Sequence, residues 1–301
     1  MTSSVPDFAP AIALRRALPL LQCPVCGFEL TEYDGGVPSR RVRTLGCSGG
    51  HRFDTAKQGY VTLLGSAGRT SGGDDAAQLD KREAVLSAGH FDPLVSRIVD
   101  AVRPALGVGG VLLDCGAGTG FYLRRILDSC EGAIGIGTEI SSAAARRLAK
   151  AHPRAAAIVA DTWRGLPVAD GSVDALTVVF APRNAAEFAR CLRPGGLLVV
   201  AWPGQDHLSP LRADLGMLDI EKDKETRLGA ELKEYFDLDE GASSTVTSEL
   251  RLSPNEAVGI ALMGPSGARI GDEEMRRRVT ELGRDAYAAT LTVNVSVLRK
   301  R

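Results

Sequence analysis

Three cysteines and one histidine near the N-terminus have the spacing of a metal site. Residues 23–51 read CPVCGFELTEYDGGVPSRRVRTLGCSGGH, which is C-x2-C, then 20 residues, then C-x3-H. Each pair falls in a short turn, and four such ligands close a tetrahedral site with no position left for a reacting water. The pattern therefore predicts a structural zinc ion bound by Cys23, Cys26, Cys47 and His51. Its binding would supply folding free energy to a module too small to fold alone.

The stretch after these ligands, HRFDTAKQGYVTLL, interleaves basic and aromatic residues. Surfaces of this kind bind phosphates and stack nucleobases, so Arg52 and Lys57 are candidate RNA contacts. For Phe53 and the apolar run 61–64 we expect packing of the zinc module against the rest of the chain. The next stretch, GSAGRTSGGDD, is typical of a linker and carries a further candidate, Arg69. We therefore predict a zinc-binding domain with its leading segment over residues 1–70 and a second domain over 71–301.

Overall composition restricts the possible function classes. The chain has 301 residues, 44% of them hydrophobic, and a net charge of -1, which argues against wholesale electrostatic binding of nucleic acid. Residues 1–70 nevertheless hold eight Lys/Arg against five Asp/Glu, so a polyanion would meet the chain there. We find no long apolar run and no basic segment ahead of the first apolar one, and so expect a cytoplasmic protein without a membrane span or signal peptide. In that compartment the remaining cysteines are predicted to be buried free thiols: Cys115, Cys130 and Cys191.

A second chemical pattern lies in GGVLLDCGAGTGFYLRRIL, residues 109–127. An apolar strand ends in Asp114 and enters a loop with glycines at 116, 118 and 120, followed by an amphipathic helix. Such a loop serves nicotinamide or adenosylmethionine cofactors. An acidic residue at the strand end and the G-x-G-x-G spacing favour adenosylmethionine, with the loop passing under its amino-acid part. The candidate contacts are Asp114, Gly116, Gly118 and Gly120.

The following segments repeat a strand and helix rhythm. A second strand ends in Glu139, 25 residues after Asp114, where a carboxylate can accept both ribose hydroxyls. A third strand is predicted to end at Asp161, which would accept from the adenine amino group with Thr162 and Trp163 beside the ring. A fourth strand over 175–180, a helix, an LRPGG loop, a fifth strand and a closing strand near the C-terminus follow. This alternation predicts an α/β fold: a class I, Rossmann-like, S-adenosylmethionine-dependent methyltransferase domain behind a small N-terminal zinc-binding domain.

Taken together, several motifs carry a resemblance to a known family: CPVCG with CSGGH, FDTAKQGYVTLL, AGHFDPL, DCGAGTG, VFAPRN with LRPGG, and WPGQDHL. With them the chain resembles the RlmA-like 23S ribosomal RNA (guanine-N1)-methyltransferases, and within these the Gram-positive branch related to tylosin-resistance methyltransferases. The resemblance implies transfer of a methyl group from S-adenosylmethionine to N1 of a guanine in a hairpin loop of 23S rRNA. That loop lies near the macrolide-binding exit tunnel, so a contribution to macrolide resistance is implied as well.

The resemblance also implies roles for individual residues. Cys23, Cys26, Cys47 and His51 match the zinc ligands, Gly118 and Thr119 the glycine-loop contacts, and His207 a cofactor-contacting histidine. Phe91 stands where relatives often have a tyrosine against the cofactor, so only stacking is expected of it. The family implies a homodimer, and the zinc module would recognise the RNA.

Two rival functions remain, and the roles of two residues in VFAPRN stay undecided. The chain could methylate a small molecule, or it could be a non-catalytic zinc-dependent RNA-binding protein. In VFAPRN, Arg183 or Asn184 could bind guanine O6 or a phosphate, while the alternative for Arg183 is a surface position at the start of a helix. No general base is assigned.

Overall fold

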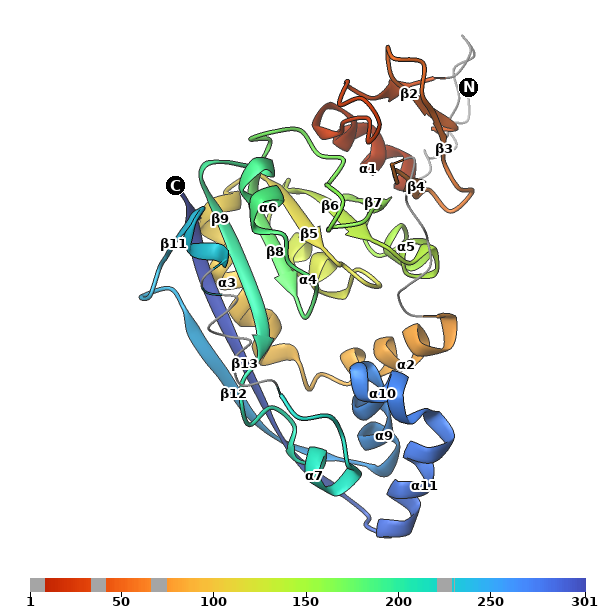
Figure 1. Cartoon of the computed structure of the whole chain (residues 1–301), viewed down its shortest axis with the longest axis vertical. Helices are drawn as coiled ribbons and strands as arrows, with labels where there is room; N and C mark the ends of the chain where they lie inside the picture. The colour runs from red at the N-terminus through yellow and green to blue at the C-terminus, as the bar shows by residue number, and fades with distance from the viewer. Residues whose placement is uncertain (1–8, 34–41, 66–74, 221–228, 230) are drawn as a thin grey trace, which may run out of the picture.

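A computed structural model describes residues 9–33, 42–65, 75–220, 229 and 231–301. Its centre is a mixed sheet with the order β10-β13-β9-β8-β5-β6-β7-β4 (Figure 1). Neighbouring strands from β4 to β9 are parallel, and β13 runs antiparallel to β9. The predicted parallel sheet is confirmed, and its strand order reverses between β5 and β8, where α/β folds bind ligands. The central strands are β5 (Val111–Cys115), β6 (Ile134–Glu139), β7 (Ala155–Val159), β8 (Val173–Val179) and β9 (Leu192–Pro203).

The sheet continues at both edges. β13 (Tyr287–Lys300) is the predicted closing strand, and its side chains alternate between buried and partly exposed over most of its length. It pairs antiparallel with three further strands, β10 (Ser209–Pro210), β11 (Phe236–Leu238) and β12 (Ser244–Leu252). At the opposite edge β4 (Val61–Thr62), which comes from the N-terminal part of the chain, pairs in parallel with β7.

Three strand boundaries differ from the prediction, and the first is that of β8, which spans Val173–Val179 instead of 175–180. β7 ends at Val159, so Asp161 lies in the loop beyond the strand. β9 already begins at Leu192, so the LRPGG stretch extends the strand instead of forming a separate loop. The β8–β9 register shifts between Val173 and Ala175, and this irregularity accommodates the Pro-Gly-Gly segment.

Helices cover both faces of the sheet, because successive strand side chains point to opposite sides. Leu112 belongs to the hydrophobic cluster on one face and Leu113 to the cluster on the other. The first face is covered by α3 (Asp92–Leu106), α4 (Phe121–Ser129) and α5 (Ser142–Leu148), and the second by α1 (Ala9–Ala17), the short helix η1 (Leu18–Leu20) and α6 (Ala185–Cys191). Before α3 comes α2 (Ala76–Ser87), which ends at a short turn ahead of it. Cys115, Cys130 and Cys191 are buried free thiols, as predicted.

A group of helices lies at the end of the molecule toward which β8 and β9 run (Figure 1). Two of them begin with a capping box, which satisfies N–H groups that have no partner within the helix: Asp75 with Gln78, and Ser253 with Glu256. α2 packs closely on α9 because Gly259 has no side chain; a Cβ there would stand 2.6 Å from Val85 Cγ2. The group, here called the helical lobe, consists of α2, α7 (Leu211–Leu215), α9 (Pro254–Met263), α10 (Pro265–Ile270) and α11 (Asp272–Leu282). No helix of the described part of the chain is long and apolar enough to cross a membrane.

The N-terminal module shares its core with the large sheet. Its own antiparallel sheet has three short strands, β1 (Thr31–Glu32), β2 (Thr44–Gly46) and β3 (Arg52–Asp54). α1 lies against β6 and β7, and Leu21 forms a bridge with Val168. The predicted packing of Phe53 and of the run 61–64 is confirmed, with Val61 and Leu63 fully buried. The predicted boundary at residue 70, and Arg69 with it, fall in 66–74, outside the described residues.

Candidate cofactor site and metal centre

The four predicted zinc ligands come together in the structure. Their ligand atoms all lie within 4.8 Å of one another. His51 Nδ1 is 3.6 Å from Cys23 Sγ and 3.4 Å from Cys47 Sγ, and Cys26 Sγ is 3.6 Å from Cys47 Sγ. A tetrahedral zinc ion with ordinary bond lengths separates sulfur from nitrogen by about 3.6 Å and two sulfurs by about 3.8 Å. The donor set therefore fits zinc in number, type and spacing, and it leaves no position for a reacting water.

Glycine-containing turns position these ligands. Gly27 N donates to Cys23 O, and Gly50 N donates to Cys47 O, both across turns in which the glycine has a positive φ. Gly49 leaves room for the cluster, since a Cβ there would stand only 3.1 Å from Cys26 Sγ.

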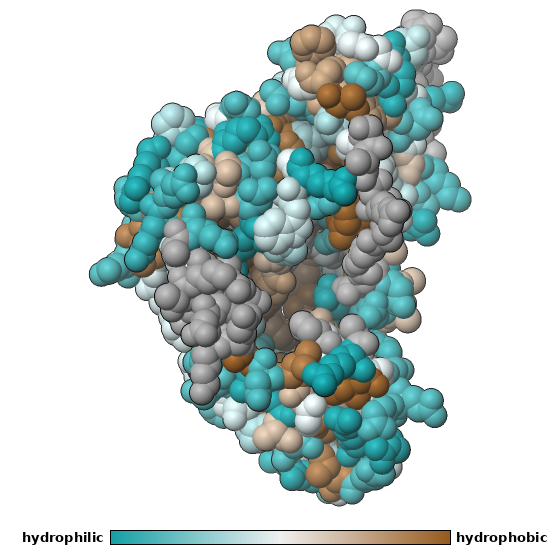
Figure 2. Space-filling view, viewed as in Figure 1, coloured by the Kyte–Doolittle hydropathy of each residue, from teal (hydrophilic) through white to brown (hydrophobic). Residues whose placement is uncertain are grey.

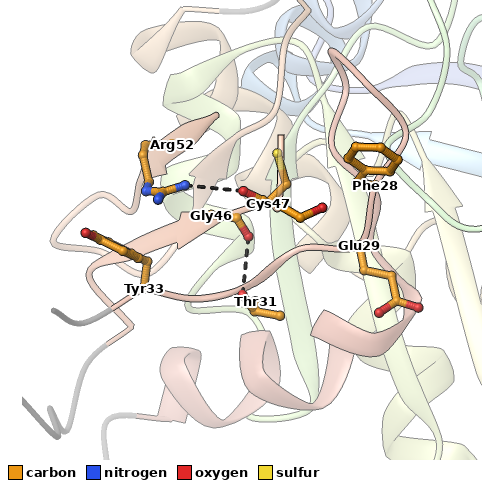
Figure 3. Close-up of a pocket in the computed structure, with 8 residues that line it drawn as sticks. Phe28, Glu29, Thr31, Tyr33, Gly46, Cys47 and Arg52 are labelled. Carbon is orange, nitrogen blue, oxygen red and sulfur yellow. Dashed lines mark hydrogen bonds between the residues drawn. The ribbon is translucent and has the colours of Figure 1, made fainter. Parts of the chain in front are cut away.

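An open pocket of about 510 Å³ lies beside the metal centre (Figure 3). Arg52 holds its guanidinium 4.1 Å from the centre of the Tyr33 ring and donates to the carbonyl oxygens of Cys47 and His51. Phe28 and Tyr33 are 53% and 50% exposed, and both line the pocket. Exposed rings beside a fixed cation can stack nucleobases and bind phosphate. The pocket is lined by Phe28, Glu29, Thr31, Tyr33, Gly46, Cys47, Ser48 and Arg52.

Lys57, the other basic candidate of this module, is exposed but lies elsewhere. It borders a separate depression of about 330 Å³, between α1 and the loop that follows β3. The structure therefore does not bring Arg52 and Lys57 into one pocket.

The predicted cofactor residues gather at the carboxyl ends of the parallel strands. Asp114, at the end of β5, is only 2% exposed, and its Oδ1 accepts a 2.8 Å hydrogen bond from Thr177 Oγ1. Burial raises the pKa of this carboxyl to about 7, the Thr177 hydrogen bond opposes the rise, and the Glu139 charge adds to it. Nearby, Tyr122 has a buried hydroxyl without a partner among the described residues.

The glycine loop is shaped by close packing at two of its three glycines. A Cβ at Gly116 would stand 2.4 Å from the Ala181 side chain, and one at Gly120 would stand 2.7 Å from Ala151. Gly118 differs, because the nearest atom to its Cβ position is the side-chain nitrogen Arg82 Nη1, at 4.0 Å. The loop is thus tightly backed at Gly116 and Gly120 and open at Gly118, where a ligand can approach the backbone. Thr119, between them, is 7% exposed.

Glu139 lies against this loop. Its Oε2 accepts from Gly118 N at 3.0 Å, and its Oε1 accepts from the backbone N–H groups of Ile140 and Ser141. The carboxylate is held at the tip of β6 by backbone donors, next to the open glycine. This is the position from which the sequence predicts it to bind ribose hydroxyls.

Asp161 and Thr162 lie in the loop after β7. Asp161 Oδ1 accepts from Trp163 N at 3.0 Å, which fixes the turn. Asn184 Nδ2 donates to Thr162 O at 2.9 Å, while Asn184 Oδ1 caps α6 by accepting from Glu187 N. Asn184, considered above as a base or phosphate contact, therefore joins two strand-end loops.

His207 follows β9 and is held neutral. Its Nδ1 lies 2.9 Å from Thr292 O, and because a carbonyl can only accept, Nδ1 carries the proton and Nε2 is an acceptor. Burial lowers the pKa of His207 to about 4. Its ring centre is 5.9 Å from that of Phe180, an aromatic residue with a φ of 54° that is 41% exposed at the end of β8. Strained, exposed positions of this kind cluster at functional sites, and the sequence alone did not indicate Phe180.

Two further predicted contacts, Phe91 and Arg183, are buried as well. Phe91, which precedes α3, is 3% exposed and belongs to the same hydrophobic cluster as Ala117 in the glycine loop. Arg183 is 8% exposed, with its guanidinium 5.5 Å from the Trp202 ring centre, and burial lowers its pKa to about 10. The alternative prediction of a surface position for Arg183 is therefore wrong, because its side chain turns inward onto the sheet. Its contact with RNA stays a prediction.

The strand ends face a hollow. Figure 2 shows this face of the molecule hollowed between the sheet and the helical lobe, with hydrophobic residues on the floor of the hollow. Carboxylates at consecutive strand ends, an open glycine and a neutral histidine suit a ligand with ribose hydroxyls and an adenine amino group. The residues present therefore fit S-adenosylmethionine.

Comparison with known proteins supports both parts. A profile described as "RlmA, N-terminal" matches residues 21–71, and one described as "Methyltransferase domain" matches residues 112–196. A Micromonospora griseorubida protein named putative 23S rRNA (guanine-N(1)-)-methyltransferase is 40% identical, covering 94% of this chain and 98% of its own. The Streptomyces fradiae 23S rRNA (guanine(748)-N(1))-methyltransferase is 39% identical, covering 93% and 96%. A Bacillus subtilis protein with the same putative name is 31% identical, covering 64% and 67%. The chain therefore belongs to the family of S-adenosylmethionine-dependent 23S rRNA (guanine-N1)-methyltransferases, as its motifs indicated.

Proposed function

We propose that this protein transfers a methyl group from S-adenosylmethionine to N1 of a guanine in a hairpin loop of 23S rRNA. The observation that carries the proposal is the near-full-length match, zinc module included, to two relatives named for this reaction. The name of the Streptomyces fradiae relative specifies guanine 748, and we propose the equivalent position here. The reaction would take place in the cytoplasm, and the product would contribute to tylosin-type macrolide resistance.

The strand ends would hold the donor, whose sulfonium supplies an already activated methyl group. Glu139 would accept from the ribose hydroxyls and Asp161 from the adenine amino group, while Gly118 leaves its backbone open to the amino-acid part. The protein's main task is then to align the guanine with the methyl group. Phe180, exposed at the end of β8, is suited to stack on the extruded base.

Asp114 is assigned to support of the loop and not to proton abstraction. Its pKa of about 7 would suit a base, but the carboxyl is 2% exposed and accepts from Thr177 on the neighbouring strand. A general base must reach the proton that it removes. We assign no general base, and we propose that the N1 proton leaves to solvent.

The zinc module would contact the RNA through its open pocket. Phe28 and Tyr33 offer exposed rings, and Arg52, fixed by two carbonyl oxygens, offers a cation beside them (Figure 3). Loop bases are unstacked and can be splayed onto such rings, which is how proteins read single-stranded RNA. The metal would fold this surface and would take no part in the chemistry.

Two rival functions make different predictions. A small-molecule methyltransferase would bind the donor and leave rRNA unmodified, and a non-catalytic RNA-binding protein would bind RNA and leave the donor unchanged. We also infer a homodimer from the family resemblance, which sedimentation velocity tests.

Nucleoside analysis tests the proposed reaction. The zinc-loaded protein is incubated with S-adenosylmethionine and unmethylated 23S rRNA, the RNA is digested, and nucleosides are quantified by mass spectrometry. We expect 1-methylguanosine to approach one per RNA molecule. Another methylated nucleoside, or none despite measurable donor binding, would contradict the proposal.

A further inference from the structure

Arg82, on α2, reaches the glycine loop from the helical lobe. Its Nη1 stands 4.0 Å from the position that a Cβ on Gly118 would occupy. Gly118 is the open glycine of the loop, so this guanidinium lies beside the backbone that the donor must approach. Arg82 lies outside the strand-end motifs of the sheet, in a helix of the lobe.

One hydrogen bond and the packing of its helix fix this side chain in place. Arg82 Nη2 donates a 2.9 Å hydrogen bond to the carbonyl of Met263, the last residue of α9. Carbonyls in the last turn of a helix lack intrahelical partners and carry partial negative charge, which favours a cation. α2 is itself held to α9 by the close approach of Val85 to Gly259. The guanidinium is therefore positioned before any ligand binds.

The charges around the loop favour a cation there. Asp114 and Glu139 are close enough that the Glu139 charge raises the pKa of Asp114. Burial and the Asp114 charge raise the pKa of Tyr122, and the Arg82 charge opposes this rise. Arg82 thus lies close enough to the loop for its charge to act on Tyr122, which also feels the Asp114 charge.

The donor carries one anionic group, the carboxylate of its methionine part, together with an ammonium and a sulfonium. The Glu139 carboxylate and the partly ionised Asp114 carboxyl beside the loop would repel that anion in the absence of a neighbouring cation. A guanidinium is the side chain best matched to a carboxylate, since it can donate two parallel N–H bonds. Gly118 gives the ligand room to approach it.

We propose that Arg82 binds the α-carboxylate of S-adenosylmethionine and of its product, S-adenosylhomocysteine. The helical lobe thereby contributes directly to the cofactor site, through a residue that α9 holds in place. This inference rests on the identity of the methyl donor and is independent of which RNA base is modified.

Isothermal titration calorimetry on the full-length, zinc-loaded protein tests the proposal without any activity readout. The probes are S-adenosylhomocysteine and its decarboxylated analogue, which keeps the adenosine, sulfur and amine but lacks the carboxylate. The variants are Arg82→Gln, Arg82→Lys and a matched control, Lys81→Gln, which removes a neighbouring charge on α2 that pairs with Asp272.

We expect Arg82→Gln to weaken S-adenosylhomocysteine binding about 10- to 100-fold, the usual effect of losing a charge-assisted hydrogen-bonded pair. The same variant should bind the decarboxylated analogue as the unaltered protein does. Arg82→Lys should recover part of the loss, and Lys81→Gln should change neither affinity.

Equal weakening toward both probes would overturn the proposal, because it would show that Arg82 only supports the fold. Unchanged affinity for both probes would overturn it as well. If the unaltered protein bound neither probe, the identity of the donor would fail together with the inference. Absence of RNA methylation with intact S-adenosylhomocysteine binding would count against the proposed RNA substrate alone.

Discussion

His207 makes the stability of this protein depend on pH in a calculable way. Its pKa is about 4 in the folded state, chiefly because the imidazole is buried, against an ordinary value of 6.5. Below pH 6.5 the imidazole of His207 is protonated in the unfolded chain, whereas in the folded chain it stays neutral down to about pH 4. Acidification therefore favours unfolding, and from pH 7 to pH 5 this single group lowers the free energy of unfolding by about 2 kcal/mol.

The change to make is His207→Gln, whose amide can still donate to Thr292 O but does not titrate. Urea unfolding at pH 7 and pH 5 gives the free energy of unfolding for both proteins. We expect the unaltered protein to lose about 2 kcal/mol more than the variant between these pH values. The raised pKa of Asp114 acts in the opposite direction, because it lowers the free energy of unfolding as the pH rises. This contribution is the same in both proteins and therefore cancels when they are compared. Identical pH dependence in the two proteins would refute the neutral, buried imidazole.

Three further predictions concern the cofactor, the RNA and the metal. Glu139→Ala removes the acceptor of three backbone N–H groups and should weaken S-adenosylhomocysteine binding about tenfold by calorimetry; unchanged affinity would count against its ribose role. Tyr33→Ala should weaken binding of the 23S hairpin about tenfold in a filter assay, with S-adenosylhomocysteine affinity unaltered; a loss of both would mean misfolding. Cys47→Ser should reduce zinc, measured by atomic absorption, well below one per chain and lower the melting temperature. The melting temperature should respond because the module shares a core with the sheet. Full zinc occupancy and an unchanged melting temperature in that variant would contradict the assigned ligand set.

Local patterns allowed much of the fold and the site to be predicted. The zinc ligands are close in sequence and lie in turns with characteristic glycines, so their meeting follows from spacing alone. The strands of the α/β domain have apolar runs that end in Asp114, Glu139 and the loop of Asp161, and strand ends of a parallel sheet meet at one edge.

Features that depend on long-range packing were not predictable in this way. Arg82 reaches the glycine loop only because α2 packs on α9, which lies far along the chain. The inward turn of Arg183 onto Trp202 and the positive φ of Phe180 depend on the surrounding sheet and carry no local signal. Similarly, the pairing of β4 with β7 could not be predicted, because β4 is a strand of only two residues.

Primer extension tests the central claim most directly. Unmethylated 23S rRNA is treated with the zinc-loaded protein and S-adenosylmethionine, and reverse transcriptase is run across the hairpin loop. N1 methylation blocks base pairing, so we predict one donor-dependent stop, adjacent to the guanine equivalent to position 748. Stops at several unrelated guanines, or full-length product from RNA incubated with donor-binding protein, would contradict the account.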